Sequence, residues 1–284
     1  MKQRRLGRTG LDISEIGFGC GTTADLMIHG SPDERRNAVA RALDLGINYF
    51  DTAPAYGNTV SETNLGQALA ELGATPIVAT KVALSLDELD DIAGAVVRSV
   101  EGSIARLGLP RLTLVQLHNR VGAHRAAKPD IGTGALMTVD DVLGPGGVVE
   151  GLNRLRDRGL VEFFGCCAFG GETEAVARLI DSNLFDTILV HYSALNTTAW
   201  TAPAEAGIRD YGRAGARATE AGMGTIALRV LEGGKLATSP QAAEDALRFA
   251  LGNGEISTVL VGFSALNQID QAAHAADRGD LPQS

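Results

Sequence analysis

Cysteine, aromatic residues and positive charge are all scarce in this chain, and each shortage excludes a class of protein. Only three cysteines occur in 284 residues, and two of them, Cys166 and Cys167, are adjacent, so they do not read as a disulfide framework. A reducing, cytoplasmic location is therefore expected. Lysine and arginine number 25 against 34 acidic residues, giving a net charge of -9. Because phosphate binding needs a clustered positive field, no nucleic-acid partner is expected.

Long hydrophobic runs are lacking as well. The longest apolar stretch, around Ile188-Leu189-Val190, has the length of a strand, whereas a membrane-spanning helix needs about 20 apolar residues. The charged start, Met1 to Arg5, is not followed by the apolar segment of a signal peptide. We therefore expect no membrane association and no targeting segment. Adjacent cysteines point to opposite faces of a strand, so no metal site is predicted either.

Aliphatic residues are abundant, because hydrophobic residues make up 45% of the chain and aromatic residues only 5%. Short apolar runs alternate with longer amphipathic stretches along the sequence. Eight such units indicate a parallel sheet that is buried on both faces. Eight strands close a (β/α)8 TIM barrel, which typically needs about 250 residues. We therefore predict one (β/α)8 barrel catalytic domain over residues 1–284.

The units are assigned from the apolar pattern and from glycine and proline at the boundaries. The predicted strands are Ile16–Gly19, Tyr49–Asp51, Ile77–Lys81, Leu112–His118, Phe163–Cys167, Thr187–Val190, Gly224–Ala227 and Thr258–Val261. The predicted helices are Pro32–Leu45, Ser61–Glu71, Leu89–Leu107, Gly147–Arg158, Glu172–Asp181, Gly207–Ala221, Pro240–Leu251 and Leu266–Ala276.

Two segments lie outside these units. Residues 5–13, with glycines at their centre, suggest a short N-terminal β-hairpin that would plug the barrel floor. The longest irregular stretch runs from Asn119 to about Gly146 and is rich in glycine. Loops of this length are usually functional or disordered. Since this one follows the strand that ends at His118, we interpret it as a wall or lid of the substrate pocket.

Four reactive side chains lie at or just beyond the carboxyl ends of predicted strands. Asp51 ends one strand, Tyr56 lies in the turn that follows it, and Lys81 and His118 end the next two strands. In a parallel barrel these ends meet at one mouth, where such barrels place their active sites. The sequence therefore predicts a site that combines a carboxylate, a phenol, an ammonium and an imidazole.

This combination can transfer protons. A free tyrosine has a pKa of about 10 and is a poor base at neutral pH, but a nearby ammonium lowers the pKa of a phenol. Asp51 would keep Lys81 charged, Lys81 would tune Tyr56, and His118 would orient a carbonyl oxygen or share the proton transfer. Taken singly, each residue also has a structural interpretation, as a cap, a surface aromatic, a solvated charge or a hydrogen-bonded histidine. Their common position at one mouth favours the functional interpretation.

The segments around these residues resemble the aldo-keto reductase superfamily, and the resemblance runs through nearly the whole chain. The matching segments are Leu6–Leu11 with Ile16–Gly19, Gly46–Ala53 with Tyr56-Gly57, Ser61-Glu62, Leu65-Gly66, Thr80-Lys81, Arg106–Gly108 through Leu117-His118, and Val261-Gly262. The resemblance implies a (β/α)8 barrel that uses NAD or NADP without a Rossmann domain. It also implies a catalytic tetrad of Asp51, Tyr56, Lys81 and His118. In such a tetrad Tyr56 protonates a carbonyl oxygen as hydride arrives from the nicotinamide.

The resemblance further implies which residues hold the dinucleotide. These are Gly19, Cys20, Cys167, Ala168, Leu189, Arg229, Leu231, Gly233, Gly234, Gly262, Ser264 and Gln268. Three of these positions depart from the family pattern. Cys167 and Ala168 replace a serine–asparagine pair that holds the nicotinamide amide, and Leu189 replaces a glutamine. The segment from Arg229 to Lys235 resembles the family's pyrophosphate-covering loop.

The choice between NAD and NADP stays open at the level of sequence. Members of the family that prefer NADP place basic residues against the 2′-phosphate after the position of Gly262. Here no lysine or arginine occurs from Phe249 to Asp277, so a 2′-phosphate would lack charge-assisted partners in this segment. The chain would either prefer NAD, or bind dinucleotide weakly or not at all.

Three hypotheses follow. The leading one is an NAD(P)-dependent oxidoreductase that interconverts a small carbonyl compound (an aldehyde, ketone or sugar lactol) and an alcohol. The second is a redox-neutral acid–base enzyme on the same barrel: a lyase, epimerase or hydratase. The third is a dinucleotide-sensing regulatory subunit, for which channel-associated members of the superfamily are the precedent. The sequence does not determine the substrate, the direction or the oligomeric state.

Overall fold

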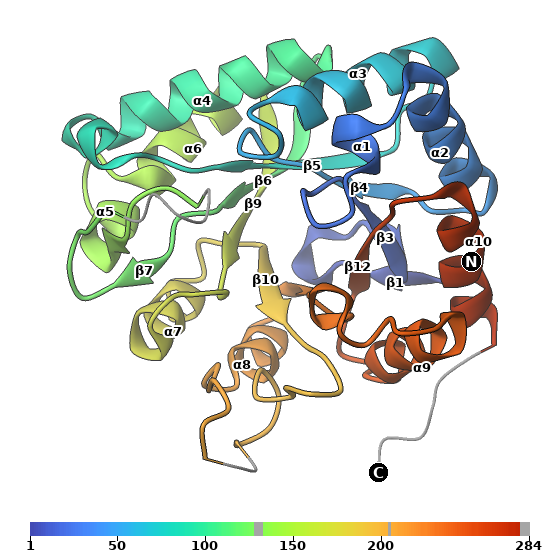
Figure 1. The fold of residues 1–284 in the computed structure, drawn as a ribbon. Helices are drawn as coiled ribbons and strands as arrows, with labels where there is room; N and C mark the ends of the chain where they lie inside the picture. Colours follow the sequence, from blue (N-terminus) through green and yellow to red (C-terminus); the bar gives the residue numbers. More distant parts are fainter. Residues whose placement is uncertain (128–132, 204–205, 279–284) are drawn as a thin grey trace.

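The computed structural model describes residues 1–127, 133–203 and 206–278, and its centre is a closed barrel of eight parallel strands (Figure 1). The strands follow one another around the barrel in chain order, and β12 closes it by pairing with β3. The barrel strands are β3 (Ile16–Gly19), β4 (Tyr49–Asp51), β5 (Ile77–Val82), β6 (Leu112–Leu117), β9 (Val161–Cys167), β10 (Thr187–His191), β11 (Gly224–Leu228) and β12 (Thr258–Gly262). The predicted (β/α)8 fold is confirmed.

Helices form a ring outside the strands (Figure 1). They are α1 (Leu26–His29), α2 (Pro32–Asp44), α3 (Val60–Leu72), α4 (Ile92–Leu107), α5 (Val139–Leu143), α6 (Val148–Asp157), α7 (Thr173–Asp181), α8 (Ala214–Glu220), α9 (Pro240–Leu251) and α10 (Leu266–Asp277). Short 3-10 segments are η1 (Gly7–Thr9), η2 (Leu86–Asp90) and η3 (Glu232–Gly234). Among the helices of the described ranges, none is both long enough and apolar enough to cross a bilayer.

Local chemistry explains where the helices begin and end. Ser31 and Glu34 form a reciprocal capping box ahead of α2, and Pro32 occupies the first turn, where no N–H partner is needed. At the other end of a helix, Gly108 follows α4 with a φ of 64°, a left-handed conformation that glycine adopts at little cost. These signals are visible in the sequence, so the predicted bounds of α2 and α4 lie close to the observed ones.

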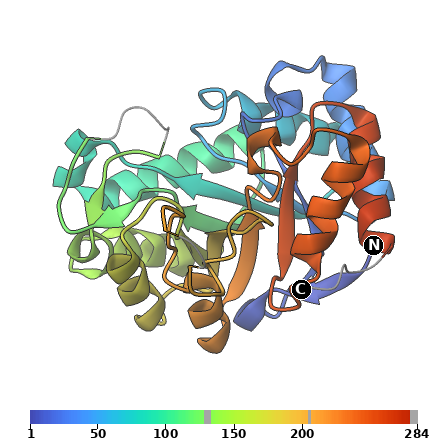
Figure 2. The ribbon, with the colours of Figure 1, turned by 60° about the horizontal axis from the view of Figure 1, so that its bottom comes forward.

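The predicted hairpin is present and closes the floor of the barrel. Strands β1 (Gln3–Arg5) and β2 (Asp12–Ser14) pair antiparallel, and Figure 2 shows them below the barrel strands. Leu6 and Ile13 are fully buried in the cluster that fills the barrel interior. Gly7 approaches the start of β11 so closely that a Cβ would lie 2.1 Å from the backbone nitrogen of Gly224. Glycine is therefore required at this turn.

Two predictions of local structure were wrong. The helix expected over Gly207–Ala221 begins only at Ala214, because the backbone N–H of Gly212 donates to Asp210 in a turn and Gly212 itself has a positive φ. The stretch from Asn119 to Gly146 contains β7 (Val121–Gly122), β8 (Met137–Thr138) and α5. A capping box between Thr138 and Asp141 starts α5. Residues 128–132 of this stretch, which include Pro129 and Gly132, lie outside the described residues.

Candidate active site

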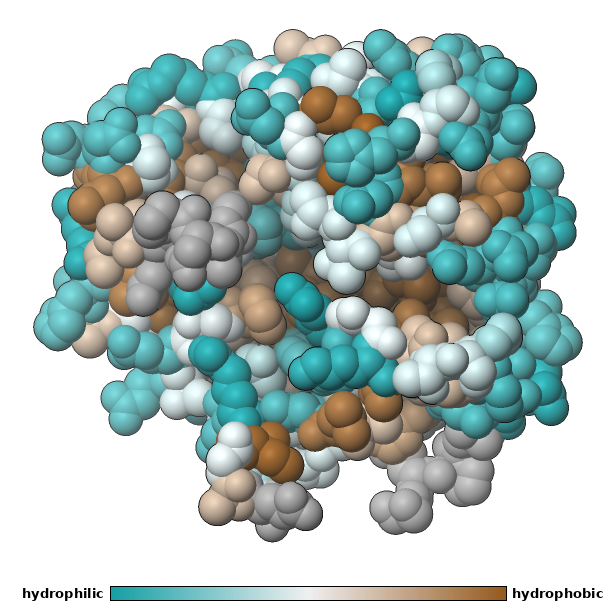
Figure 3. Space-filling model, viewed as in Figure 1, coloured by the Kyte–Doolittle hydropathy of each residue, from teal (hydrophilic) through white to brown (hydrophobic). Residues whose placement is uncertain are grey.

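The four candidate catalytic side chains line one cavity of about 680 Å³, and Figure 3 shows the surface hollowed on this face. Asp51 is the last residue of β4, Lys81 lies next to the last residue of β5, and His118 follows β6 directly. Tyr56 comes from the turn between β4 and α3. The barrel topology thus brings together residues that are up to 67 positions apart (118 minus 51) in the sequence.

Asp51 and Lys81 form a buried ion pair at the centre of the site. Their side chains are 3% and 2% exposed, and the Lys81 ammonium donates to Asp51 Oδ1 and to the carbonyl oxygen of Thr52 at 2.9 Å. Burial alone would lower the pKa of Lys81, but the Asp51 carboxylate and the neighbouring Tyr56 raise it above its ordinary value. Lys81 therefore keeps its proton and its charge across the physiological pH range.

Gln116 supports the ion pair from the barrel interior. Its Nε2 donates to Asp51 Oδ2 at 2.8 Å, so each carboxylate oxygen has its own partner. A buried ion pair is stable only when its remaining hydrogen-bonding capacity is also used. Gln116 was not among the predicted site residues. The available signal was a single amide in the mostly apolar run of β6, since a buried polar side chain in a strand requires a partner.

The phenol of Tyr56 lies beside the ammonium. Lys81 Nζ is 4.8 Å from the centroid of the Tyr56 ring. Burial raises the pKa of Tyr56, the positive charge of Lys81 opposes this, and the net pKa is above the ordinary value of tyrosine. The sequence predicted the effect of Lys81 correctly in sign but overlooked burial, which outweighs it. In this cavity the phenol is protonated at neutral pH.

His118 lies near the phenol as a neutral imidazole. The two rings are 6.1 Å apart between centroids in an edge-to-face arrangement. Burial, together with the charge of Lys81, lowers the pKa of His118 to about 3. Its Nδ1 is buried without a hydrogen-bond partner. A neutral ring can donate a hydrogen bond from one nitrogen to a substrate oxygen, and it carries no positive charge that would repel the Lys81 ammonium.

Most of the residues predicted to hold dinucleotide line the same cavity, which continues from the four side chains towards α9 and α10. Lining residues from the prediction are Gly19, Cys167, Leu189, Arg229, Leu231, Gly233, Gly234, Gly262, Ser264 and Gln268. Cys20 and Ala168 do not line it. Both follow an inward-facing residue, so strand alternation turns them into the layer between barrel and helices, where they are buried.

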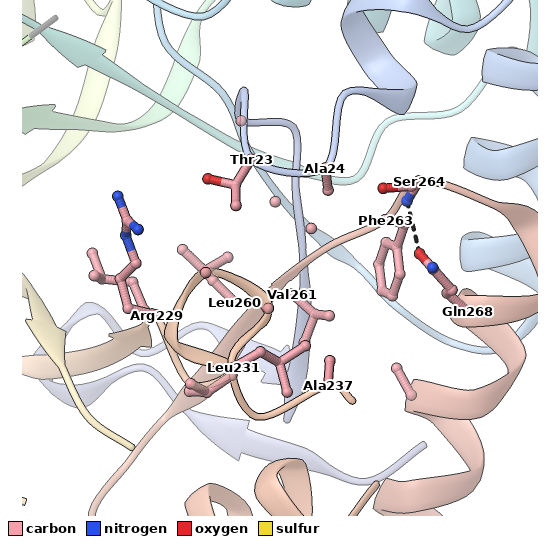
Figure 4. Close-up of a pocket in the computed structure, with 18 of the residues that line it drawn as sticks. Thr23, Ala24, Arg229, Leu231, Ala237, Leu260, Val261, Phe263, Ser264 and Gln268 are labelled. Atoms are coloured by element: carbon pink, nitrogen blue, oxygen red, sulfur yellow. Dashed lines mark hydrogen bonds between the residues drawn. The ribbon is translucent and has the colours of Figure 1, made fainter. Parts of the chain in front are cut away.

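Part of the cavity wall was not predicted from the sequence. The loop from Gly21 to Ala24 covers one side, and Figure 4 shows Thr23 and Ala24 opposite Arg229 and Leu231. At the far end Glu244, Asn267 and Gln271 join the lining. The run of small residues from Gly19 to Ala24 was a usable signal, because small side chains after a barrel strand leave room for a ligand.

The two adjacent cysteines face different environments, as strand alternation predicts. Cys166 packs between the barrel and the helices, whereas Cys167 belongs to the barrel interior and lines the cavity. Burial raises the pKa of the Cys167 thiol to about 11. The group is therefore a neutral thiol at physiological pH, neither a nucleophilic thiolate nor a charged ligand.

A cluster of hydrogen bonds holds the β11–α9 loop, residues 229–239, against the end of β10. Glu232 accepts hydrogen bonds from His191 Nε2 at 2.6 Å and from Ser193 Oγ at 2.5 Å. Burial would raise the pKa of Glu232, but these two partners lower it below its ordinary value. Arg229 and Glu232 have positive φ angles of 62° and 51°. Such conformations persist in non-glycine residues only when surrounding contacts fix them.

A parallel eight-stranded barrel with this set of acidic, basic and phenolic side chains at its mouth defines a class of barrel enzymes. A model of the aldo/keto reductase family matches residues 15–246. The chain therefore belongs to the aldo/keto reductase family, an oxidoreductase family whose members generally use NAD(P). The family match favours neither the redox-neutral nor the regulatory hypothesis.

Individual relatives and structures resemble the chain over most or part of its length. It is 28% identical to L-galactose dehydrogenase from Arabidopsis thaliana, over 94% of this chain and 86% of that protein. Pyridoxal 4-dehydrogenase from Microbacterium luteolum is 28% identical over 58% of this chain and 54% of that protein. The holo form of aldo-keto reductase AKR11C1 from Bacillus halodurans superposes with a TM-score of 0.76 at 21% identity, over 99% and 93% of the two chains. At that identity the likeness concerns the fold alone.

Proposed function

We propose that the protein interconverts a carbonyl compound and an alcohol by hydride transfer, with Tyr56 as general acid and base. The observation that carries this proposal is the buried Asp51–Lys81 pair next to a protonated phenol in an open cavity. A group that must give up a proton needs a neighbour that stabilises the resulting charge. Lys81 supplies that charge and does not itself lose its proton.

Each side chain has a distinct part in this proposal. Tyr56 donates its proton to the carbonyl oxygen during reduction and takes a proton from the alcohol during oxidation. Lys81 stabilises the phenolate between these events, and Asp51 holds Lys81 in place. His118, as a neutral ring, donates a hydrogen bond that orients the carbonyl oxygen.

The cavity suits a nicotinamide dinucleotide. Its volume lies within the roughly 300–1,000 Å³ of small-molecule sites, and it extends from the four polar side chains along small and apolar residues to α10. When bound here, the nicotinamide would supply or accept hydride at the mouth of the barrel. Gly233 and Gly234 would face the pyrophosphate, and Cys167 and Leu189 would form the floor beneath the nicotinamide.

We further propose that the dinucleotide is NAD. Among the described lining residues, Lys81 and Arg229 are the basic ones, and neither lies at the end formed by α9 and α10. That end presents the carboxylate of Glu244 and the neutral side chains of Ser264 and Gln268. Gln268 already accepts the backbone N–H of Ser264 at 2.8 Å (Figure 4). A 2′-phosphate would face the Glu244 carboxylate, and the Ser264 N–H that could donate to it is already bound to Gln268. A ribose diol is uncharged and would fit these neutral partners.

For the substrate we propose an aldehyde or a sugar lactol. The support comes from the names of the two curated relatives, a dehydrogenase of a sugar and a dehydrogenase of pyridoxal, which is an aldehyde. Both kinds of compound present one C–O centre to hydride transfer and one oxygen to a proton donor. The four side chains at the cavity mouth require no more than this.

Titration of the purified protein with NADH and NADPH tests the proposed function. Binding is followed by nicotinamide fluorescence, and turnover is then measured by absorbance with a panel of aldehydes and aldoses. We expect micromolar affinity for NADH, at least about tenfold weaker binding of NADPH, and turnover of at least one compound. If neither dinucleotide binds, the proposal is wrong. Tighter binding of NADPH would contradict only the choice of NAD.

A further inference from the structure

Three arginines beside the cavity have no acidic partner within ion-pair distance in the described part of the chain. They are Arg120, Arg209 and Arg229. On the outer surface, by contrast, Arg41 pairs with Asp270 and Arg217 with Asp181. A net charge of -9 offers an arginine many possible acidic partners. Arg209 and Arg229 are exposed, whereas the Nε of Arg120 is buried, so the lack of a partner needs an explanation above all at Arg120.

These arginines converge on one short segment, residues 169–171, directly after β9. The Arg229 guanidinium lies 5.6 Å from the centroid of the Phe169 ring. Arg120 packs over Gly170, where a Cβ would lie 2.6 Å from Arg120 Nε. Arg209 donates to the carbonyl oxygen of the next residue at 3.2 Å. The three come from the loops after β6, β10 and β11.

The segment borders the cavity. Phe169 and Arg229 line it, and so does Cys167, two residues before Phe169. Arg120 also acts electrostatically on this wall. Burial has the largest effect on the pKa of Cys167 and raises it, and the positive charge of Arg120 is among the charges that lower it. Arg120 Nε is buried and has no hydrogen-bond partner. Leaving a buried N–H of a charged group unpaired is costly.

Nearby carboxylates are engaged elsewhere. Glu232 binds His191 and Ser193, and Glu172 accepts the backbone N–H of Ala123 at 3.1 Å. Neither forms an ion pair with any of the three arginines in the described residues. Of the three arginines, Arg229 lines the cavity, so its guanidinium presents N–H donors there, in the planar arrangement that matches an oxyanion.

Resting on the proposed function, we propose that the carbonyl substrate carries a carboxylate, which Arg120 and Arg229 bind beside Phe169 with support from Arg209. The carbonyl carbon then reaches the cavity mouth at Tyr56, while the carboxylate takes no part in hydride or proton transfer. In a chain with a net negative charge, an anionic substrate would be repelled at long range. A local group of arginines overcomes this repulsion where the substrate binds.

Matched pairs of compounds test the proposal in the wild-type protein. The pairs are galacturonate and galactose, 4-carboxybenzaldehyde and 4-methylbenzaldehyde, and succinic semialdehyde and butanal. We expect kcat/KM to be at least about tenfold higher for the carboxylate in each pair, and the preference to shrink with added salt. Glyceraldehyde 3-phosphate with glyceraldehyde tests the other common anion. Equal or better turnover of the neutral members, or a stronger preference for the phosphate, would overturn the assignment.

Variants localise the effect. Arg120→Gln and Arg209→Gln should reduce the ratio of charged to neutral kcat/KM by about tenfold, mainly through KM. Arg217→Gln, which removes a remote arginine, should leave the ratio unchanged. An unchanged ratio in Arg120→Gln would contradict the proposal. Because the sequence resemblance also counts Arg229 among the dinucleotide residues, Arg229 is left unchanged in these variants.

A binding measurement keeps this inference separate from the proposed function. Calorimetric titration of the protein, with and without NADH, compares benzoate with neutral benzamide. We expect benzoate to bind at least about tenfold more tightly, and this difference to be lost in Arg120→Gln. This result does not depend on turnover. Absence of a preference for benzoate overturns the anion site, whereas absence of NADH binding contradicts the proposed function.

Discussion

The two halves of the barrel mouth are built on different principles. The half formed by β4, β5 and β6 joins Asp51, Lys81 and Gln116 through direct hydrogen bonds, with the carboxylate fully partnered. The half formed by β9 to β12 presents a neutral thiol, Cys167, and the apolar side chain of Leu189 to the same cavity. Proton transfer can be argued from the first half alone, whereas selection of cofactor and substrate depends on the second.

The halves also differ in what fixes them. In the first half, the reactive groups lie on or beside strands, where backbone pairing sets their positions. The second half combines strand residues such as Cys167 and Leu189 with a loop, which Glu232 attaches to β10 through His191 and Ser193. Positions held by strands should be sensitive to any change, while positions held by the loop should tolerate some substitutions and respond with altered specificity.

The largest expected effect belongs to the first half. Tyr56→Phe removes the proton donor but keeps the ring, so we expect kcat to fall by about 10²–10⁴-fold and the Kd for NADH to change by less than about twofold. Steady-state kinetics and fluorescence titration measure both. Tyr211→Phe, which alters a phenol next to His191 in the second half, is the matched control and should retain most of the activity. If kcat falls by a comparable factor in both variants, proton transfer does not depend on the first half alone.

The buried ion pair should dominate stability as well. Lys81→Met leaves Asp51 buried without its partner, and we expect the free energy of unfolding to fall by about 3–5 kcal/mol. Asp181→Asn breaks the exposed pair with Arg217 and should cost less than about 1 kcal/mol. Urea unfolding compares the two. A loss in Lys81→Met as small as that in Asp181→Asn would show that the first half is not held by this pair.

Much of the first half could be predicted from sequence, because its signals are local. Continuous apolar runs define β4, β5 and β6, and the reactive side chains mark where these strands end. What the sequence did not reveal depends on packing in three dimensions. The net rise in the pKa of Tyr56 comes from burial, and the support from Gln116 comes through a contact between residues 65 positions apart.

The second half was harder to predict for a physical reason. Positions transferred by resemblance do not show which face of a strand they occupy, so Cys20 and Ala168 were expected at the cavity and lie outside it. The arginines around residues 169–171 come from three loops, and the first and last of these arginines, Arg120 and Arg229, are 109 positions apart (229 minus 120). No periodicity links such residues, and only the closed barrel brings them together.

The free energy of unfolding should depend on pH through His118, which belongs to the first half. Burial and Lys81 lower the pKa of His118 to about 3 in the folded protein, whereas an unfolded histidine has a pKa of about 6.5. Between these values the unfolded state binds more protons. The contribution of His118 to stability is therefore complete above about pH 6.5 and is lost as the pH falls, by up to about 1.4 kcal/mol per pH unit.

Urea unfolding between pH 4 and pH 7 measures this contribution. We expect the free energy of unfolding of His118→Asn to depend less steeply on pH than that of the wild type. The exposed His29 provides the control, and His29→Asn should retain the wild-type slope. If both variants retain that slope, His118 titrates normally and burial does not lower its pKa as described.

The smallest effect is expected at the far end of the second half, where Gln268→Arg should strengthen NADPH binding by about tenfold with little change for NADH. The substitution does two things at once: it adds a cation, and it releases the Ser264 N–H that Gln268 now occupies. Gln241→Arg adds the same charge on the exposed face of α9 and separates a local contact from a general change in charge. Equal gains in the two variants would mean that the charge of the whole protein, rather than the neutral lining at α10, disfavours the 2′-phosphate.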